Sequence, residues 1–143
     1  MRRKKWVNVE WKSAPDIKKR VLHLKKSLNL EWVKTSSLYC FRSLNSSSRA
    51  YARIWGLSKI WQLALKQKPA YIIEVLSEKF DNLSEREKDR ILLHEIAHIP
   101  KNFSGRLLPH IRRRGKRNFH DRVEELFAHY QRSTVLERPF KNR

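Results

Sequence analysis

Residues 84–100 read Ser-Glu-Arg-Glu-Lys-Asp-Arg-Ile-Leu-Leu-His-Glu-Ile-Ala-His-Ile-Pro, and their pattern is that of a helix with a marked beginning and end. Ser84, followed three residues later by Glu87, matches the capping box, in which two side chains satisfy free backbone N–H groups at the start of a helix. No Gly or Pro interrupts residues 85–99, and Pro100 cannot continue a helix because it lacks a backbone N–H. The pattern predicts a helix over residues 85–99.

Two histidines lie four residues apart on this predicted helix, in the motif His94-Glu95-Ile96-Ala97-His98. Side chains at this spacing share one helix face. Two imidazoles placed in this way can both reach one zinc ion at about 2.0–2.1 Å. Glu95 is rotated by about 100° from His94, so it is a poor ligand but can take a proton from the metal-bound water. The motif therefore predicts a hydrolytic zinc site with Glu95 as general base.

A catalytic zinc usually has three protein ligands and one open position. Downstream of the motif, the candidates for the third ligand are His110, His120, Glu124, Glu125 and His129. His110 is favoured because it follows His98 by twelve residues, which allows the loop to double back to the helix. His120 lies among arginines and lysines whose charge opposes a dication. Glu124 or Glu125, on a following helix, remains an alternative ligand.

The rest of the chain reads as a mixture of helices and short strands. Pro15 begins a predicted basic amphipathic helix, and Asn118 caps a predicted final helix. Aromatic and β-branched runs at 39–41, 50–55, 59–64 and 71–76 predict short antiparallel strands joined by turns. The predicted apolar stripes of the two helices consist of Ile17, Val21, Leu24 and Leu28 in the first, and of Val123, Leu126, Phe127 and Tyr130 in the second. This pattern predicts an α+β fold in one domain over 1–143, with a basic N-terminal segment (about 1–12) and a loose tail (about 134–143).

The chain is strongly basic, with 33 Lys and Arg against 14 Asp and Glu in 143 residues, a formal net charge of +19. The excess lies in residues 1–60 and 101–143, while residues 61–100 are nearly neutral. Such flanks favour an acidic partner or a nucleic acid, because lysines and arginines release counterions from phosphates. One cysteine excludes a disulfide framework and is typical of a reducing, cytoplasmic setting. No apolar run approaches the roughly 18–20 residues of a membrane span.

Several side chains outside the motif have ordinary structural interpretations. Cys40 lies in an aromatic run and is expected to be a small buried hydrophobe. Trp55 and Trp61, on predicted strands, are expected in the core. An exposed strand edge at 59–64 or 71–76 is the expected place for a peptide substrate to add as a further strand.

Beyond single motifs, the sequence resembles the metallopeptidase family of archaea and phages. The resemblance rests on Tyr71-Ile72-Ile73-Glu74-Val75, on Ile91-Leu92-Leu93-His94-Glu95-Ile96-Ala97-His98-Ile99-Pro100, on Phe103-Ser104-Gly105 and on Pro109-His110. It implies a minimal zincin fold, in which a small antiparallel sheet packs on the metal-binding helix. It also implies His94, His98 and His110 as zinc ligands and Glu95 as the base. The sequence departs from the family in the basic run at 112–117.

These observations predict a zinc-dependent metallopeptidase that acts on peptides or proteins. A second hypothesis is a zinc hydrolase acting on nucleic acid or on nucleic-acid-bound protein, for which the SprT-like proteases, which share the H-E-x-x-H motif, are a loose analogy. A third is a non-enzymatic basic module that binds nucleic acid. The oligomeric state is left open by the sequence.

Overall fold

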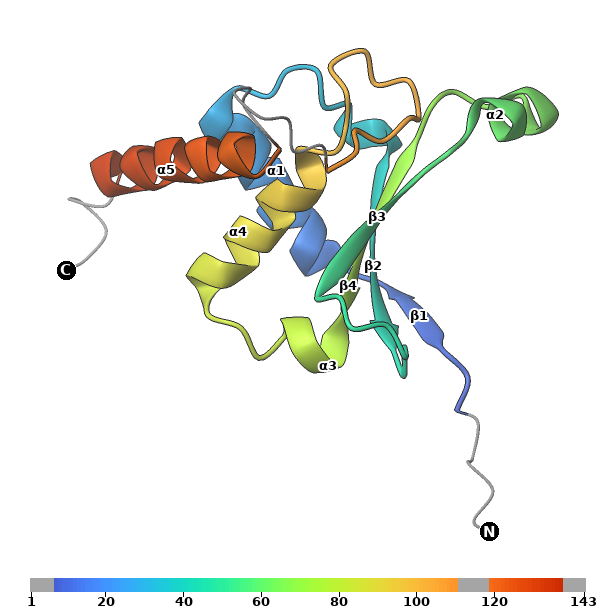
Figure 1. The fold of residues 1–143 in the computed structure, drawn as a ribbon, viewed down its shortest axis with the longest axis horizontal. Helices are drawn as coiled ribbons and strands as arrows, with labels where there is room; N and C mark the ends of the chain where they lie inside the picture. The colour runs from blue at the N-terminus through green and yellow to red at the C-terminus, as the bar shows by residue number, and fades with distance from the viewer. Residues whose placement is uncertain (1–6, 111–118, 138–143) are drawn as a thin grey trace, which may run out of the picture.

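The computed structural model describes residues 7–110 and 119–137. Four strands form one sheet in the order β1-β2-β4-β3, and helices cover one of its two faces (Figure 1). The strands are β1 (Glu10–Ser13), β2 (Leu38–Leu44), β3 (Ala52–Gly56) and β4 (Tyr71–Leu76). The predicted α+β class is confirmed.

The helices are α1 (Pro15–Leu28), α2 (Lys59–Leu65), α3 (Ser77–Phe80), α4 (Glu85–Ile96) and α5 (Phe119–Glu137), with a 3₁₀ turn, η1, at Thr35–Ser37. Helix α5 packs on α1 and α4, which in turn contact the sheet. The last turn of α5, residues 134–137, coincides with the beginning of the tail predicted at about 134–143. Asn118, the basic run at 112–117 and the first six residues lie outside the described residues.

The expectation of a purely antiparallel sheet is wrong, because β2 and β4 are parallel. The pairs β1–β2 and β3–β4 are antiparallel, as predicted. The reason lies in the strand order: β3 occupies the sheet edge and leaves a space beside β2 that β4 fills after α2. A strand antiparallel to β3 in that position must run parallel to β2. Strand β4 is thus internal, which explains its almost unbroken run of buried side chains.

The predicted strand at 59–64 is also wrong, because these residues form helix α2. The chain turns after β3, where Ser58 is extended and accepts the Gln62 N–H at 2.9 Å, and Lys66 ends the helix in the left-handed conformation. Of the residues in α2, only Gln62 is buried. The strand was predicted from the aromatic and branched side chains of this run. In the structure these side chains are exposed on a helix and do not belong to a paired strand.

The hydrophobic core lies between the sheet and α1, α4 and α5. Cys40 is buried, as predicted, and so is the predicted apolar stripe of α1. The prediction that Trp55 and Trp61 are core residues is wrong, since 50% and 58% of these residues is exposed. Within the described residues, no helix has the length and apolar character needed to cross a bilayer.

Candidate metal centre

Helix α4 begins as the sequence predicts, because Ser84 Oγ accepts the Glu87 backbone N–H at 3.2 Å. The helix ends at Ile96, three residues earlier than predicted, and the chain continues through His98 in tighter turns. The His98 N–H donates to the Glu95 carbonyl at 3.1 Å, which keeps His98 close to His94. The centroids of the two imidazole rings lie 5.1 Å apart.

The loop after Pro100 doubles back to this end of α4. Leu108 donates its N–H to the His98 carbonyl at 2.7 Å, and its own carbonyl lies 2.5 Å from His98 Nδ1. A carbonyl can only accept, so His98 Nδ1 carries the proton and its Nε2 keeps a free lone pair. Metal-binding histidines commonly make such a bond from the second ring nitrogen, because it fixes the tautomer and the ring orientation.

The same loop brings His110 to the histidine pair. His110 Nε2 lies 2.9 Å from His94 Nε2, and one ring nitrogen from each of the three histidines lies within 4.8 Å of the others. Nitrogens bound tetrahedrally at about 2.0–2.1 Å from one zinc ion are about 3.4 Å apart. The observed spacing brackets this value, so small ring movements suffice to place all three around one ion. The three histidines therefore form a group that can hold a metal.

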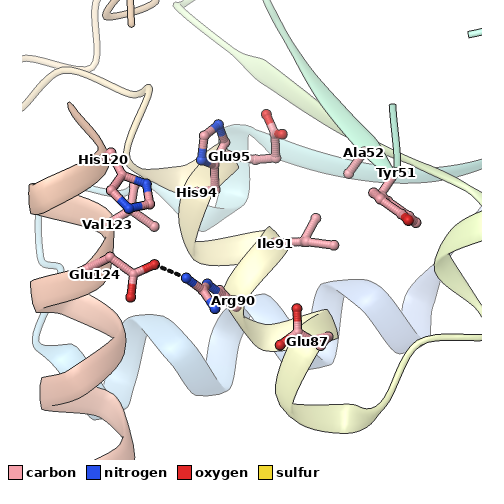
Figure 2. Close-up of a pocket in the computed structure, with 10 residues that line it drawn as sticks. All are labelled: Tyr51, Ala52, Glu87, Arg90, Ile91, His94, Glu95, His120, Val123 and Glu124. Atoms are coloured by element: carbon pink, nitrogen blue, oxygen red, sulfur yellow. Dashed lines mark hydrogen bonds and ion pairs between the residues drawn. The ribbon is translucent and has the colours of Figure 1, made fainter. Parts of the chain in front are cut away.

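The other candidate third ligands do not belong to this group of three histidines. Figure 2 shows His120 and Glu124 projecting from α5 toward α4, where Glu124 forms an ion pair with Arg90. Glu125 and His129 line a different pocket, together with Trp32 of the loop after α1. In the described part of the chain, His110 forms a group with His94 and His98 whose ligand atoms lie within 4.8 Å of one another, and none of these four residues belongs to it.

The His110 loop is anchored by residues whose role the sequence did not reveal. The Tyr71 hydroxyl accepts the Gly105 N–H at 2.8 Å and donates to the Arg106 carbonyl at 2.7 Å. Gln62 Nε2 donates to the Ser104 carbonyl at 2.9 Å. Gly105 has φ +94°, and a Cβ there would lie 2.2 Å from the Leu57 carbonyl oxygen, so only glycine fits. The sequence signals were two segments of the family resemblance, one that begins with Tyr71 and one that ends with Gly105, and neither indicated this role.

Phe119 is a second residue that the sequence analysis missed. Its ring stacks on His98, with centroids 4.2 Å apart, and lies 5.0 and 4.9 Å from the rings of His94 and His110. The buried Phe119 ring thus forms an apolar wall against all three imidazoles. An aromatic residue at the start of a helix has no sequence signature that links it to a metal site.

Burial controls the charge states at the centre. Burial, reinforced by the neighbouring imidazoles, lowers the pKa of His94 to about 4, and burial also lowers the pKa of His98. Both rings are therefore neutral near pH 7, which is the form that binds metals. Burial raises the pKa of Glu95 to about 8. A dication held by the histidines would favour the ionised carboxylate and so lower that pKa again.

A cleft of about 360 Å³ adjoins the histidines and opens between α4, α5 and the start of β3. Its lining includes Tyr51 and Ala52 on one side, His94 and Glu95 on the helix, and Val123 on α5. Neither predicted substrate edge borders it as an open strand, because residues 59–64 are helical and 71–76 lie inside the sheet. The edge strand at this cleft is β3.

The fold and the histidine cluster define a small α+β protein in which the H-E-x-x-H helix and a loop carry a group of histidines that could hold a metal ion. The sequence of residues 9–136 matches the family described as putative phage metallopeptidase. Because the match covers most of the chain, the chain belongs to this family, as the resemblance predicted. Among curated proteins and solved structures, nothing matches.

Proposed function

We propose that this protein is a zinc-dependent metallopeptidase in which His94, His98 and His110 hold Zn²⁺ and Glu95 is the general base. The observation that carries the proposal is the convergence of three imidazole nitrogens within 4.8 Å beside a buried glutamate. Three neutral nitrogen donors suit zinc, and the Leu108 carbonyl fixes His98 in the tautomer that presents Nε2. The family assignment supports the same conclusion.

Zinc at these ligands would supply Lewis acidity, which lowers the pKa of a water molecule and polarises a peptide carbonyl. Glu95 takes the proton of the attacking water and returns it to the nitrogen of the leaving amine. The burial of Glu95 removes competing solvent from the carboxylate, which strengthens each electrostatic interaction there. Phe119 limits water access on the other side of the imidazoles.

Strand β3 is the edge along which an extended peptide would bind. The Tyr51 carbonyl accepts the Leu76 N–H, and the Leu57 N–H donates to the Ala70 carbonyl. Because backbone hydrogen bonds in an antiparallel pair recur at every second residue, the odd-numbered residues of β3 are the ones whose backbone groups bond to β4. By alternation, the backbone groups of Ala52 and Ile54 point away from β4. Ala52 also lines the cleft beside Glu95. A substrate strand paired at Ala52 would thus pass the proposed base.

The test measures zinc content and peptide hydrolysis in matched variants. Glu95→Gln is expected to bind one zinc per chain and to lose at least about 100-fold in kcat on quenched fluorescent peptides, because it lacks the base. Glu87→Gln is the control, since Glu87 lines the same cleft but lies about two helix turns before His94. His110→Ala is expected to lose zinc at concentrations where His120→Ala retains it. Wild-type hydrolysis by Glu95→Gln, or unchanged zinc affinity of His110→Ala, would contradict the proposal.

A further inference from the structure

The sheet has a second face that no described helix covers. Helices α1, α3 and α4 lie against the other side, and α2 projects from the end of β3 and β4 (Figure 1). We name the uncovered side the aromatic face, because its largest side chains are aromatic. Its members are Trp11 on β1, Tyr39 and Phe41 on β2, Ile72 on β4 and Trp55 on β3.

All of these side chains except the half-buried Phe41 are exposed, and three of them lie in register. Tyr39 pairs with Ile72, and Ile72 pairs with Trp55, so the three form one row across three strands. Tyr39 and Trp55, at the ends of the row, are 53% and 50% exposed, and Trp11 is 57% exposed. Neighbouring strands lie about 4.8 Å apart, so the two rings at the row ends stand on backbones about 10 Å apart. A pocket of about 370 Å³ lies on the same face.

An ion pair between a buried glutamate and a half-buried arginine fixes one end of this row. Glu74 is 1% exposed and accepts hydrogen bonds from Arg53 Nε at 2.8 Å and from Trp55 Nε1 at 2.9 Å. The Arg53 guanidinium also lies 5.1 Å from the Trp55 ring centre, within cation–π range. The acidic charge of Glu74 is therefore neutralised beneath the surface, and the Trp55 indole is held in one orientation.

The part of the chain that supplies β2 and β3 is positively charged. Residues 32–73, which supply all of β2 and β3, contain seven Lys and Arg and no Asp or Glu. Lys34 precedes β2, and Lys59, Lys66 and Lys68 lie between β3 and β4, which places all four at the sheet end nearest the Tyr39 row. All four are exposed, and in residues 7–110 and 119–137 no ion pair engages them.

We propose that the aromatic face binds single-stranded nucleic acid, with bases stacked on Tyr39, Trp55 and Trp11 and phosphates held by the lysines at the sheet end. Flat rings on a sheet are suited to unpaired bases, whose faces are free, whereas the bases of a duplex are already stacked. A second copy of the chain is disfavoured as the occupant, because each copy carries a charge of +19 and the lysines would meet their equivalents. The exposed lysines at the sheet end are complementary to phosphate.

This inference does not rest on the metal centre, which lies on the other side of the sheet. The probe is a fluorescein-labelled oligo(dT) of roughly 12 nucleotides, titrated with the full chain carrying Glu95→Gln at about 50 mM salt and followed by fluorescence anisotropy. The oligo(rU) of the same length and a duplex are measured in parallel. We expect both single strands to bind more tightly than the duplex, and tryptophan fluorescence to be quenched on binding.

Tyr39 offers the sharpest variant, since its side chain is exposed and its hydroxyl is in no hydrogen bond within the described residues. Tyr39→Ala is expected to weaken binding about 5- to 100-fold, while Tyr39→Phe keeps the stacking ring and binds as the wild type. Trp61→Ala is the matched control, because Trp61 is as exposed as Trp55 but lies on α2. Thermal unfolding of each variant verifies that the fold is retained.

The lysines are tested through the dependence of affinity on salt. Replacing Lys34 and Lys59 with Gln removes two phosphate contacts and is expected to reduce the slope of log affinity against log salt by about 1.4. The double variant Lys25→Gln and Lys26→Gln, on α1, has the same change in net charge and is expected to leave the slope unchanged.

Four results would overturn the inference. The first is absence of binding at about 50 mM salt. The second is equal loss of affinity in Tyr39→Ala and Trp61→Ala. The third is stronger binding of the duplex than of the single strands. The fourth is a dimer in light scattering that Tyr39→Ala dissociates, because this would assign the aromatic face to self-association.

Discussion

The Tyr71 hydroxyl is the most informative group to remove, because it connects β4 to the loop that carries His110. Tyr71→Phe deletes one oxygen and keeps the ring, so the packing of Tyr71 against Phe103 is preserved. The substitution breaks two hydrogen bonds, one from the Gly105 N–H and one to the Arg106 carbonyl. We expect it to destabilise the folded state and to weaken metal binding.

The expected loss of unfolding free energy depends on whether the Gly105 N–H and the Arg106 carbonyl can find another hydrogen-bond partner in the variant. The bond from Gly105 is buried, so its N–H is left without an acceptor, at a cost of about 1–3 kcal/mol. The Arg106 carbonyl is only partly buried and regains water, so its loss is about 0.5–1 kcal/mol. The free energy of unfolding should therefore fall by about 2–3 kcal/mol. For a urea dependence of about 2 kcal/mol/M, the unfolding midpoint falls by about 1 M.

The assay is urea unfolding of the metal-free protein in chelator, followed by tryptophan fluorescence, with zinc affinity measured by competition against a chromophoric chelator. Loss of the anchor frees the loop between Pro100 and His110, so the third ligand must be ordered during metal binding. The expected loss of zinc affinity is about 10-fold or more, similar to the effect of removing a supporting hydrogen bond at other metal sites.

Tyr39→Phe is the control, because it deletes the same oxygen from an exposed tyrosine. Its unfolding free energy should stay within about 0.5 kcal/mol of the wild type. An unchanged urea midpoint for Tyr71→Phe would refute the claim that the hydroxyl anchors the loop. A lower midpoint with unchanged zinc affinity would show that the anchor stabilises the fold but does not position His110.

Two further predictions concern stability. Ser84→Ala should lower the unfolding free energy by about 1 kcal/mol in urea because the Glu87 N–H loses its acceptor, whereas Ser84→Asp, which keeps an oxygen there, should not. The hydrogen bond from Arg42 lowers the pKa of Asp16 from 3.8 to about 2, against the effect of burial. When the pKa of a carboxyl is lower in the folded state than in the unfolded state, its ionised form stabilises the folded protein at any pH above the unfolded-state pKa. This stabilisation is lost as the pH falls through the folded-state pKa. Arg42→Gln should thus cost about 1 kcal/mol at pH 7, discounted for the exposure of Asp16, and the difference from wild type should shrink between about pH 4 and pH 2. A difference that does not vary with pH would contradict this assignment.

The sequence predicted the elements whose signals are local. The cap at Ser84 and the apolar spacing of α1 are properties of neighbouring residues, and both appear in the structure. The H-E-x-x-H spacing is also local, since four residues along a helix return a side chain to the same face. These signals were sufficient for the helix that carries the first two histidines.

What the sequence could not predict depends on contacts between distant segments. The run at 59–64 has the composition of a strand, yet it forms helix α2, and β4 rather than this run pairs with β3. The place of His110 depends on Tyr71 and Gln62, which are 39 and 48 residues away in the chain and carry no metal-site signature. Phe119 likewise reaches the histidines only through the packing of α5 on α4.

Strand β4 relates the two proposed activities to each other. Its side chains alternate, so Tyr71 points to the core and anchors the His110 loop, while Ile72 and Glu74 face the aromatic side. A rigid internal strand, paired on both sides, separates the two surfaces. Tyr71→Phe should therefore weaken zinc binding without changing oligonucleotide affinity, and Tyr39→Ala should do the reverse. If both proposals hold, a single-stranded nucleic acid bound on the aromatic face leaves the cleft at β3 and α4 open. A protein bound to the same nucleic-acid strand could then enter that cleft.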